Sequence, residues 1–437
     1  MDIGTITLLI IGALFFLMAI GVPLGASTLI VSVGTAALTI GLKGGFFVVS
    51  SGVMKVFFKD SLIAVPFFVF MANMMERGGV ARELFTSMAI LGGRMRGGVA
   101  VQTVFVSVIL AAMSGIVGGE IVLLGLIALP QLFRLGYDRK LSIGAIAASG
   151  SLATLIPPSV VLIVYGAEAG VSVKDLFSGG FMPGFLLASL YITYILIRTR
   201  INPKMGPPYD APEALLPFSG RIRFMKGLVF PFILIGTVLG VIYAGWAGPT
   251  EASAIGAVGS VVVAMIRGEF SFQGLKEALW QTTVTTGSII WLIIGAVSLI
   301  GIYNRLGGGE FLHGILTGMD VAPIVVILLM MAIIMILGTF MDWIAIVFIT
   351  VPVFAPVVVD LGYDPIWFGI LFAMNIQIYM LSPPFGPACF YLKSVAPPDV
   401  TLQEIFSAVL PFIALQLIGL ALVITFPQIA LWLPSIL

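Results

Sequence analysis

Two short segments of this sequence combine tandem prolines with oxygen-bearing side chains. The first is Ala148-Ser-Gly-Ser-Leu-Ala-Thr-Leu-Ile-Pro-Pro-Ser159, and the second is Asn375-Ile-Gln-Ile-Tyr-Met-Leu-Ser-Pro-Pro-Phe-Gly-Pro387. Proline lacks a backbone N–H and clashes with the preceding helical turn, so each pair frees carbonyl oxygens. With the neighbouring hydroxyl and amide oxygens they form a hard-oxygen site suited to Na⁺. Half-helix N-termini that face a break favour an anionic carboxylate.

The surroundings of these segments are strongly apolar. Of the 437 residues, 60% are hydrophobic and only 9% are charged, and the mean hydropathy is +1.18. A soluble protein carries about 25% charged residues, so this chain must face lipid, which excludes disordered and nucleic-acid-binding proteins. At membrane depth, polar backbone is tolerated only when it is buried in protein or lines a cavity. A single Pro-Pro pair is as readily a plain kink, but two matched pairs favour a site.

Several motifs recur at one fixed spacing. Four pairs share an offset of 226 residues: Pro23-Leu-Gly-Ala-Ser27 with Pro249-Thr-Glu-Ala-Ser253, Leu135-Gly-Tyr-Asp138 with Leu361-Gly-Tyr-Asp364, Pro157-Pro158 with Pro383-Pro384, and Pro130 with Pro356. The chain therefore reads as two copies of one unit. If each copy crosses the membrane an odd number of times, the second is inverted. Many secondary transporters have this arrangement and bind substrate near the bilayer midplane.

A Gly-rich hairpin precedes each break. The apolar stretch from 97 turns at Met113-Ser-Gly-Ile-Val-Gly-Gly-Glu120 and leaves only 13 uncharged residues, 121–133, on its second arm. As a helix that arm reaches about 20 Å, short of the roughly 30 Å hydrocarbon core. The hairpin is therefore expected to enter and leave on one side. Its counterpart, 321–359, turns at Leu337-Gly-Thr-Phe-Met-Asp342 and is expected to enter from the opposite face.

The predicted fold is an all-α polytopic membrane protein with two inverted-topology repeats. Each repeat holds scaffold helices, an amphipathic arm, a re-entrant helical hairpin and a broken transmembrane helix. In the first repeat, 1–197, these parts cover about 5–78, 79–97, 97–133 and 141–170. In the second, 227–437, they cover about 228–301, 303–319, 321–359 and 365–392. A basic linker, 198–226, is placed in the cytoplasm by its excess of Lys and Arg.

Other classes of function are less favoured. The chain has one cysteine and one histidine, Cys389 and His313, and lacks hydrolase, zinc-peptidase and nucleotide-binding motifs, so we expect no enzyme and no catalytic residue. A channel would place its pore on the axis of a symmetric oligomer, whereas this symmetry is internal. Glu120 and Asp342 lie at the hairpin tips, where an acid serves equally as a ligand group or as an ordinary helix cap.

Taken in order, the hairpin tips, the paired breaks, Gly248-Pro-Thr-Glu-Ala-Ser253 and Gly338-Thr-Phe-Met-Asp342 resemble the large membrane (M) subunit of tripartite ATP-independent periplasmic (TRAP) transporters, DctM. The resemblance covers essentially the whole chain. It implies a multi-pass protein of the bacterial inner membrane that imports an organic acid, such as a C4-dicarboxylate, by Na⁺ symport and an elevator motion. It also implies two partners: a small four-helix membrane subunit (Q type) and a periplasmic substrate-binding protein (P type).

Site residues follow from matching the family's motifs onto this sequence. A first Na⁺ site comprises Ser114, Gly115, Ser149, Gly150, Ser151, Thr154 and Pro157. A second comprises Gly338, Thr339, Met341, Asn375, Gln377, Ser382 and Pro383. The substrate site comprises Gly118, Gly119, Glu120, Pro158, Ser159, Asp342 and Pro384. The alternative is a single-component anion or dicarboxylate symporter, coupled to Na⁺ or H⁺, which has the same repeat logic but works without a binding protein.

Overall fold

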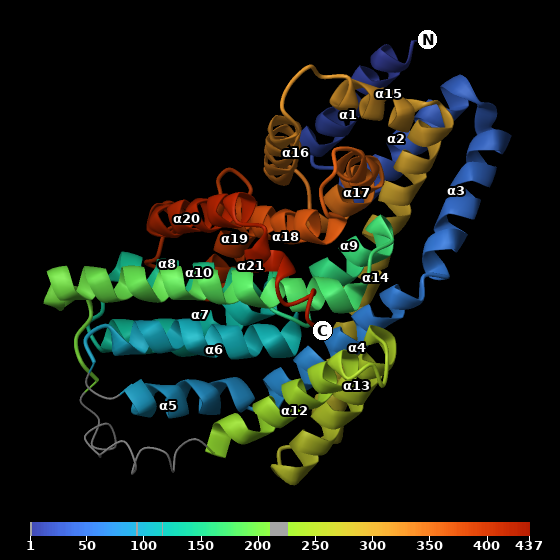
Figure 1. Cartoon of the computed structure of the whole chain (residues 1–437). Helices are drawn as coiled ribbons and strands as arrows, with labels where there is room; N and C mark the ends of the chain where they lie inside the picture. Colours follow the sequence, from blue (N-terminus) through green and yellow to red (C-terminus); the bar gives the residue numbers. More distant parts are fainter. Residues whose placement is uncertain (1, 93–94, 116, 210–225) are drawn as a thin grey trace.

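The computed structural model describes residues 2–92, 95–115, 117–209 and 226–437, and within these ranges the chain is helical and has no strand (Figure 1). The first half contains α1 (Ile3–Ala19), α2 (Leu24–Thr39), α3 (Gly41–Phe57), α4 (Asp60–Arg77), α5 (Val80–Gly92), α6 (Gly98–Ser114), α7 (Gly119–Arg134), α8 (Arg139–Gly150), η1 (Ser151–Thr154), α9 (Val160–Ala169), α10 (Val173–Ile201) and η2 (Pro203–Met205). The second half contains α12 (Lys226–Tyr243), α13 (Pro249–Ile266), α14 (Phe272–Arg305), α15 (Gly308–Thr317), α16 (Pro323–Gly338), α17 (Trp343–Asp360), α18 (Pro365–Leu381), α19 (Pro387–Val395), α20 (Leu402–Thr425) and α21 (Gln428–Leu431).

The order of the helices repeats at the spacing found in the sequence. Eight helices of the first half, all except α3 and α4, have a counterpart that starts within about three residues of the 226-residue offset. In the second half, the single helix α14 corresponds to both α3 and α4. In the first half, Lys59 adopts an extended conformation and separates the two. This pattern supports a duplication, while the inverted orientation of the second copy in the membrane stays a prediction.

Some predicted boundaries differ from the helices observed. The expected arm 303–319 is shorter, because Tyr303, Asn304 and Arg305 complete the last turn of α14 and the arm helix α15 begins only at Gly308. The helix α10 continues to Ile201, past the predicted end of the first repeat, because the apolar stretch is followed by residues that still permit helix. Most of the expected linker, 210–225, lies outside the described residues.

Each hairpin packs against the broken helices of both halves. The first arms α6 and α16 contact α8 and α18 of their own half. The second arms cross over: α7 packs on α19, and α17 packs on α9. In Figure 1, α18 and α19 of the second half accordingly lie beside α8 and α10 of the first half. The two halves therefore share one interlocked core around the helix breaks.

A second group of helices, α2, α4, α13 and α14, packs closely through small residues. A Cβ placed on Gly25 of α2 would lie 2.6 Å from the Trp291 ring of α14, and one on Gly295 would lie 2.6 Å from the Gly25 carbonyl oxygen. Small residues allow such close contact between helices in a membrane. Along the right side of Figure 1, α14 passes α4 and α13. We call α1–α4 and α12–α14 the scaffold helices.

Helix length and composition fit a multi-pass membrane protein. Five helices of the described chain are long and apolar enough to cross a bilayer, namely α10, α13, α14, α17 and α20, and further apolar helices are shorter. Large apolar side chains such as Leu38, Phe46 and Phe47 are exposed on α2 and α3. Such surfaces are stable only against lipid or another apolar protein surface. The protein is therefore integral to a membrane.

Ion pairs join distant parts of the chain at the helix ends. Arg139, at the start of α8, donates to Asp399 at 2.8 Å and to Glu404 at 2.9 Å, which ties the first broken helix to the start of α20. The Arg139 guanidinium holds the pKa of the Asp399 carboxyl below its usual range. Lys59 donates to Glu168 at 2.5 Å and so joins the scaffold at α4 to the end of α9.

The Arg139 pair predicts a pH-dependent contribution to stability. Because the folded-state pKa of Asp399 is lowered, the contribution is present above the ordinary carboxyl pKa of about 4 and is lost as the pH falls through the lowered value. We expect Arg139→Gln to lower the unfolding midpoint by about 1 °C at pH 7, since exposed pairs are weak, and by less below pH 4. Differential scanning fluorimetry measures this, and Lys140→Gln, one residue along and exposed, is the control. Equal effects of both variants would contradict the prediction.

Candidate cation and anion site at the helix breaks

The first helix break lies directly beneath the tip of the first hairpin. Gly115 ends α6 with a φ of 60°, and its carbonyl oxygen accepts a hydrogen bond of 3.0 Å from the Val160 N–H, the first residue of α9. A Cβ on Gly115 would lie 2.2 Å from the Pro158 carbonyl oxygen. Glycine is therefore required at Gly115 both for the backbone conformation and for the close approach. The hairpin tip closes the break by pairing with its backbone.

Hydroxyl groups line the first break, and each donates to a carbonyl oxygen nearby. Ser151 donates to Ala148 at 2.7 Å, Thr154 to Ser151 at 3.1 Å, and Ser159 to Thr154 at 2.6 Å, and all of these serine and threonine side chains are buried. Ser149 donates more weakly to Ile146, at 3.4 Å. A hydroxyl that donates its proton to a carbonyl keeps its own lone pairs for another donor or for a cation. The donor set is therefore oxygen-only, as Na⁺ prefers.

The carboxyl group of Glu120 belongs to the same place. Ser114, the last residue of α6, donates to one Glu120 oxygen across the hairpin tip, and the other oxygen is buried without a hydrogen-bond partner in the described chain. Beside it, a Cβ on Gly150 would lie 2.4 Å from Ile121, so the end of α8 touches the start of α7. The structure thus brings the residues predicted for the first Na⁺ site together with Glu120, Pro158 and Ser159.

In the second half, α18 packs tightly against the second hairpin. A Cβ on Gly338 would lie 2.2 Å from the Tyr379 ring, and the Asn375 amide donates to the Met331 carbonyl oxygen at 2.7 Å. The Asn375 carbonyl oxygen and both amide atoms of Gln377 are buried and lack partners in the described part of the chain. Buried polar atoms without partners are rare and costly, so this amide pair is suited to bind a group that the chain itself does not supply.

The second break differs from the first in its exposure. Pro383, Pro384 and Phe385 are exposed, whereas every residue of 151–160 is buried. Ser382 donates to Ile378 within its own helix, and Thr339 donates to Ile336 within the hairpin, so each hydroxyl is bonded locally and not to the other residue. Met341 is buried and lines a cavity whose walls include α1 and the end of α14. The residues predicted for the second Na⁺ site are therefore only partly brought together.

The two tip acids have different roles. Asp342 is the N-cap of α17 and accepts from the Ile344 N–H at 3.0 Å, whereas Glu120 pairs with Ser114. Gly118 has a φ of 116°. A Cβ placed on Gly118 would lie 3.2 Å from the ring of Tyr391 on α19. At Gly119 a built Cβ meets no atom within 4 Å. There is therefore open space at the start of α7, next to an aromatic ring of the other half.

Sequence reasoning missed several residues that the structure brings to the breaks. One of them is Tyr391, which lies beside Gly118. Its equivalent at the 226-residue offset is Tyr165, which donates to the Pro365 carbonyl oxygen at 2.9 Å. Because a tyrosine occurs at both matched positions, the repeat offset was a usable signal for this pair. Gln416 of α20 donates to Ser151 at 3.2 Å. Its signal was a single amide in the apolar stretch 405–425 of a long helix. Thr154 also approaches the Ala373 carbonyl oxygen at 3.5 Å, which joins the first break to α18.

Comparison with known proteins identifies relatives along the whole chain. Residues 11–429 match the family described as "Tripartite ATP-independent periplasmic transporter, DctM component". A C4-dicarboxylate TRAP transporter large permease protein of Vibrio cholerae is 27% identical, covering 97% of this chain and 98% of the relative. One of Pseudomonas aeruginosa is 31% identical, covering 86% of each. Other relatives are named for ectoine, sialic acid and isethionate, the last as a permease protein DctMQ.

Solved structures share the fold. The MtrF protein of Neisseria gonorrhoeae superposes with a TM-score of 0.62 at 15% identity, covering 90% of this chain and 85% of that protein. The YdaH transporter of Alcanivorax borkumensis superposes with a TM-score of 0.59 at 16% identity, covering 98% of each chain. At these identities the likeness concerns the arrangement of helices.

The contact at Gly115 yields a prediction about stability. We expect Gly115→Ala to lower the free energy of unfolding by about 2–4 kcal/mol, because alanine is strained at positive φ and its Cβ meets the backbone of Pro158. Unfolding by denaturant in detergent micelles measures it. The control is Gly287→Ala in α14, where a built Cβ meets no atom within 4 Å. A Gly115→Ala protein as stable as the control would show that the tip does not rest on the break.

Proposed function

The chain belongs to the DctM family of tripartite ATP-independent periplasmic transporters, and from this membership we propose that it imports an organic acid across the bacterial inner membrane by Na⁺ symport. The family consists of transporter permeases, not enzymes, and its members carry out secondary transport of organic acids. Coupling to Na⁺, the elevator motion and the identity of the acid are the parts that we add.

Matched oxygen-bearing pairs in the two halves carry the proposal of Na⁺ coupling. Ser149 and Ser151 of the first half correspond, at the 226-residue offset, to Asn375 and Gln377 of the second. The first pair is buried beside a break closed by a hairpin tip, and the second is buried with amide atoms that lack partners in the described chain. Hard oxygen atoms of hydroxyl and amide groups suit an alkali cation. One Na⁺ would be held by each pair, and its positive charge would favour a carboxylate nearby.

The space between the hairpin tip and α19 suits the organic acid. Three helices begin here: α7 at Gly119, α9 after the Ser159 cap, and α19 at Pro387. Helix N-termini present free N–H groups and a partial positive charge to a carboxylate. The exposed second break at Pro383 and Pro384 would serve as the entrance. A C4-dicarboxylate is the first candidate, because several relatives carry that name.

An elevator motion would use the two groups of helices. The hairpins and broken helices of both halves interlock, so they would move as one body against the scaffold helices. Na⁺ and substrate together would neutralise the site and permit the movement. A small four-helix membrane subunit would brace the scaffold, and a periplasmic binding protein would deliver the acid. A relative that bears the name DctMQ is consistent with the first of these partners.

Uptake in proteoliposomes tests the proposed function. We would reconstitute this chain with the small subunit, impose an inward Na⁺ gradient, and offer labelled succinate, sialic acid, ectoine and isethionate with and without the binding protein. We expect uptake of one acid that requires Na⁺ and the binding protein together. Uptake by this chain alone would favour the single-component symporter, and uptake that is equal without Na⁺ at zero membrane potential would refute Na⁺ coupling.

Gln377 supplies a sharper test of the second cation site. We expect Gln377→Leu to reduce Na⁺-driven uptake at least tenfold or to raise the Na⁺ concentration for half-maximal uptake by a similar factor. Its stability should not fall, because leucine removes buried polar atoms that have no partner in the described chain. The control is Gln102→Leu, equally buried in α6, whose amide donates to the Ala89 carbonyl oxygen. Loss of stability with unchanged Na⁺ dependence would mean that Gln377 is only structural.

A further inference from the structure

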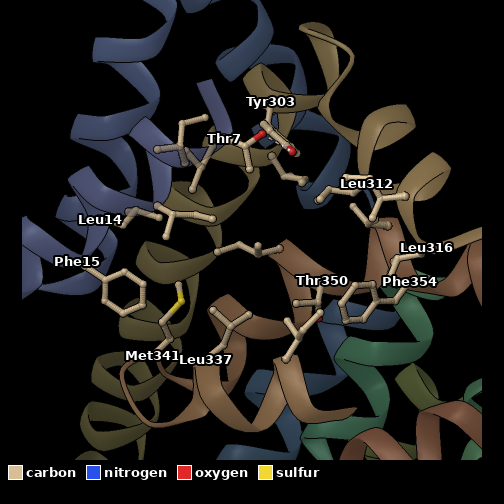
Figure 2. Close-up of a pocket in the computed structure, with 18 of the residues that line it drawn as sticks. Thr7, Leu14, Phe15, Tyr303, Leu312, Leu316, Leu337, Met341, Thr350 and Phe354 are labelled. Atoms are coloured by element: carbon tan, nitrogen blue, oxygen red, sulfur yellow. Dashed lines mark hydrogen bonds between the residues drawn. The ribbon is translucent and has the colours of Figure 1, made fainter. Parts of the chain in front are cut away.

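A cavity of about 440 Å³ lies away from the helix breaks, between the scaffold and the second hairpin. Its walls come from α1, the end of α14 and the arm helix α15 on one side, and from α16 and α17 on the other. Figure 2 shows Thr7 and Tyr303 at one end, and Phe15, Leu337 and Met341 at the other. Near this second end, the rings of Phe15 and Phe340 meet edge to face at 4.9 Å.

The lining of the cavity is almost entirely apolar. Its three hydroxyl groups, on Thr7, Tyr303 and Thr350, already form hydrogen bonds within the protein. The Thr7 and Tyr303 hydroxyls bond each other at 2.9 Å, and Thr7 also reaches the Ile3 carbonyl oxygen. Thr350 donates to the Ile346 carbonyl oxygen at 2.7 Å. Water in such a cavity would find too few hydrogen-bond partners, and a carboxylate substrate would be desolvated without compensation. The occupant must therefore be apolar.

The cavity opens onto the surface that faces lipid. Ile11, Ile315 and Leu329 line it and are themselves exposed, so they mark its mouth. Around the mouth, Leu8 of α1 and Leu328 of α16 are exposed apolar side chains of helices that lie in the membrane. The medium at the entrance is therefore the hydrocarbon of the bilayer, and acyl chains are the apolar groups at hand.

The volume discriminates between possible occupants. A cavity of 150 Å³ binds benzene, so 440 Å³ has room for a flexible chain rather than for one ring. A helix about 10 Å across fills roughly 420 Å³ per turn, so a spanning helix of a partner does not fit. We propose that this cavity is a lipid site that holds one acyl chain of a membrane phospholipid between the scaffold and the second hairpin.

The position of the site gives the lipid a consequence for movement, and this consequence alone rests on the proposed function. The acyl chain would fill the gap between the scaffold helices, which stay in place, and the second hairpin, which moves. Without it, sliding of α16 and α17 past α1 would open an empty apolar space, which is unfavourable. The lipid would thus fill this space in one position of the hairpin. It would leave the space in the other position.

Photo-crosslinking tests the site on the unmodified protein. The chain would be reconstituted with a phosphatidylethanolamine that carries a diazirine in one acyl chain, irradiated, and analysed by peptide mass spectrometry. We expect label on Leu14 and Val353, which line the cavity and are buried from the outer surface, besides the label on outward residues such as Leu8. Label confined to outward residues would overturn the proposal. No uptake is measured, so this result is independent of the proposed function.

Two further arms sharpen the test. Ile333→Trp places a larger side chain in the cavity, and we expect at least a threefold loss of label on Leu14 and Val353. Leu328→Trp, on the same helix but outside the cavity and exposed, should leave that label unchanged. The labelling would be repeated with the small membrane subunit present. Equal label in both variants, or loss of the label when the subunit binds, would refute a lipid site.

Discussion

The structure depends on one constraint: backbone polar atoms that a helix break frees inside an apolar protein must find partners within that protein. At the first break this requirement is met by the hairpin. The Gly115 carbonyl oxygen pairs with the Val160 N–H, and Ser159 donates to the Thr154 carbonyl oxygen across the gap. The first of these contacts forms only with the hairpin in place. The position of the hairpin tip, and with it the position of Ser114 and Glu120, therefore follows from where the backbone is left unpaired.

The same constraint explains why the two halves interlock instead of lying side by side. Each broken helix needs cover along its whole length, because its break would otherwise face lipid. The arms α6 and α16 cover the first parts of α8 and α18, and the crossing arms α7 and α17 cover α19 and α9. The scaffold helices meet each other instead through glycines such as Gly25 and Gly295. Two differently built groups of helices within one chain would permit the relative movement that we propose.

Among the places where the described chain does not complete its own interior, two differ sharply in polarity. The amide groups of Asn375 and Gln377 are polar, buried and partly unpaired, whereas the cavity beside α1 and α16 is apolar and open to lipid. From this difference in polarity we propose a hard cation for the first and an acyl chain for the second. Both lie on the second hairpin or on α18 behind it, while the first hairpin closes its break fully.

The sequence by itself determined the class of protein, the helix breaks and their pairing, because these depend on local chemistry. The apolar composition requires a membrane environment, and each Pro-Pro pair ends a helix. A constant offset of 226 residues relates Ser149 and Ser151 to Asn375 and Gln377. The family follows from the same motifs. Tertiary structure alone decided that Tyr391 of one half lies beside Gly118 of the other, and that Gln416 supports Ser151. It also decided that the first break is buried and the second exposed. These contacts join residues up to hundreds of positions apart, and they are fixed by how helices pack rather than by any local pattern.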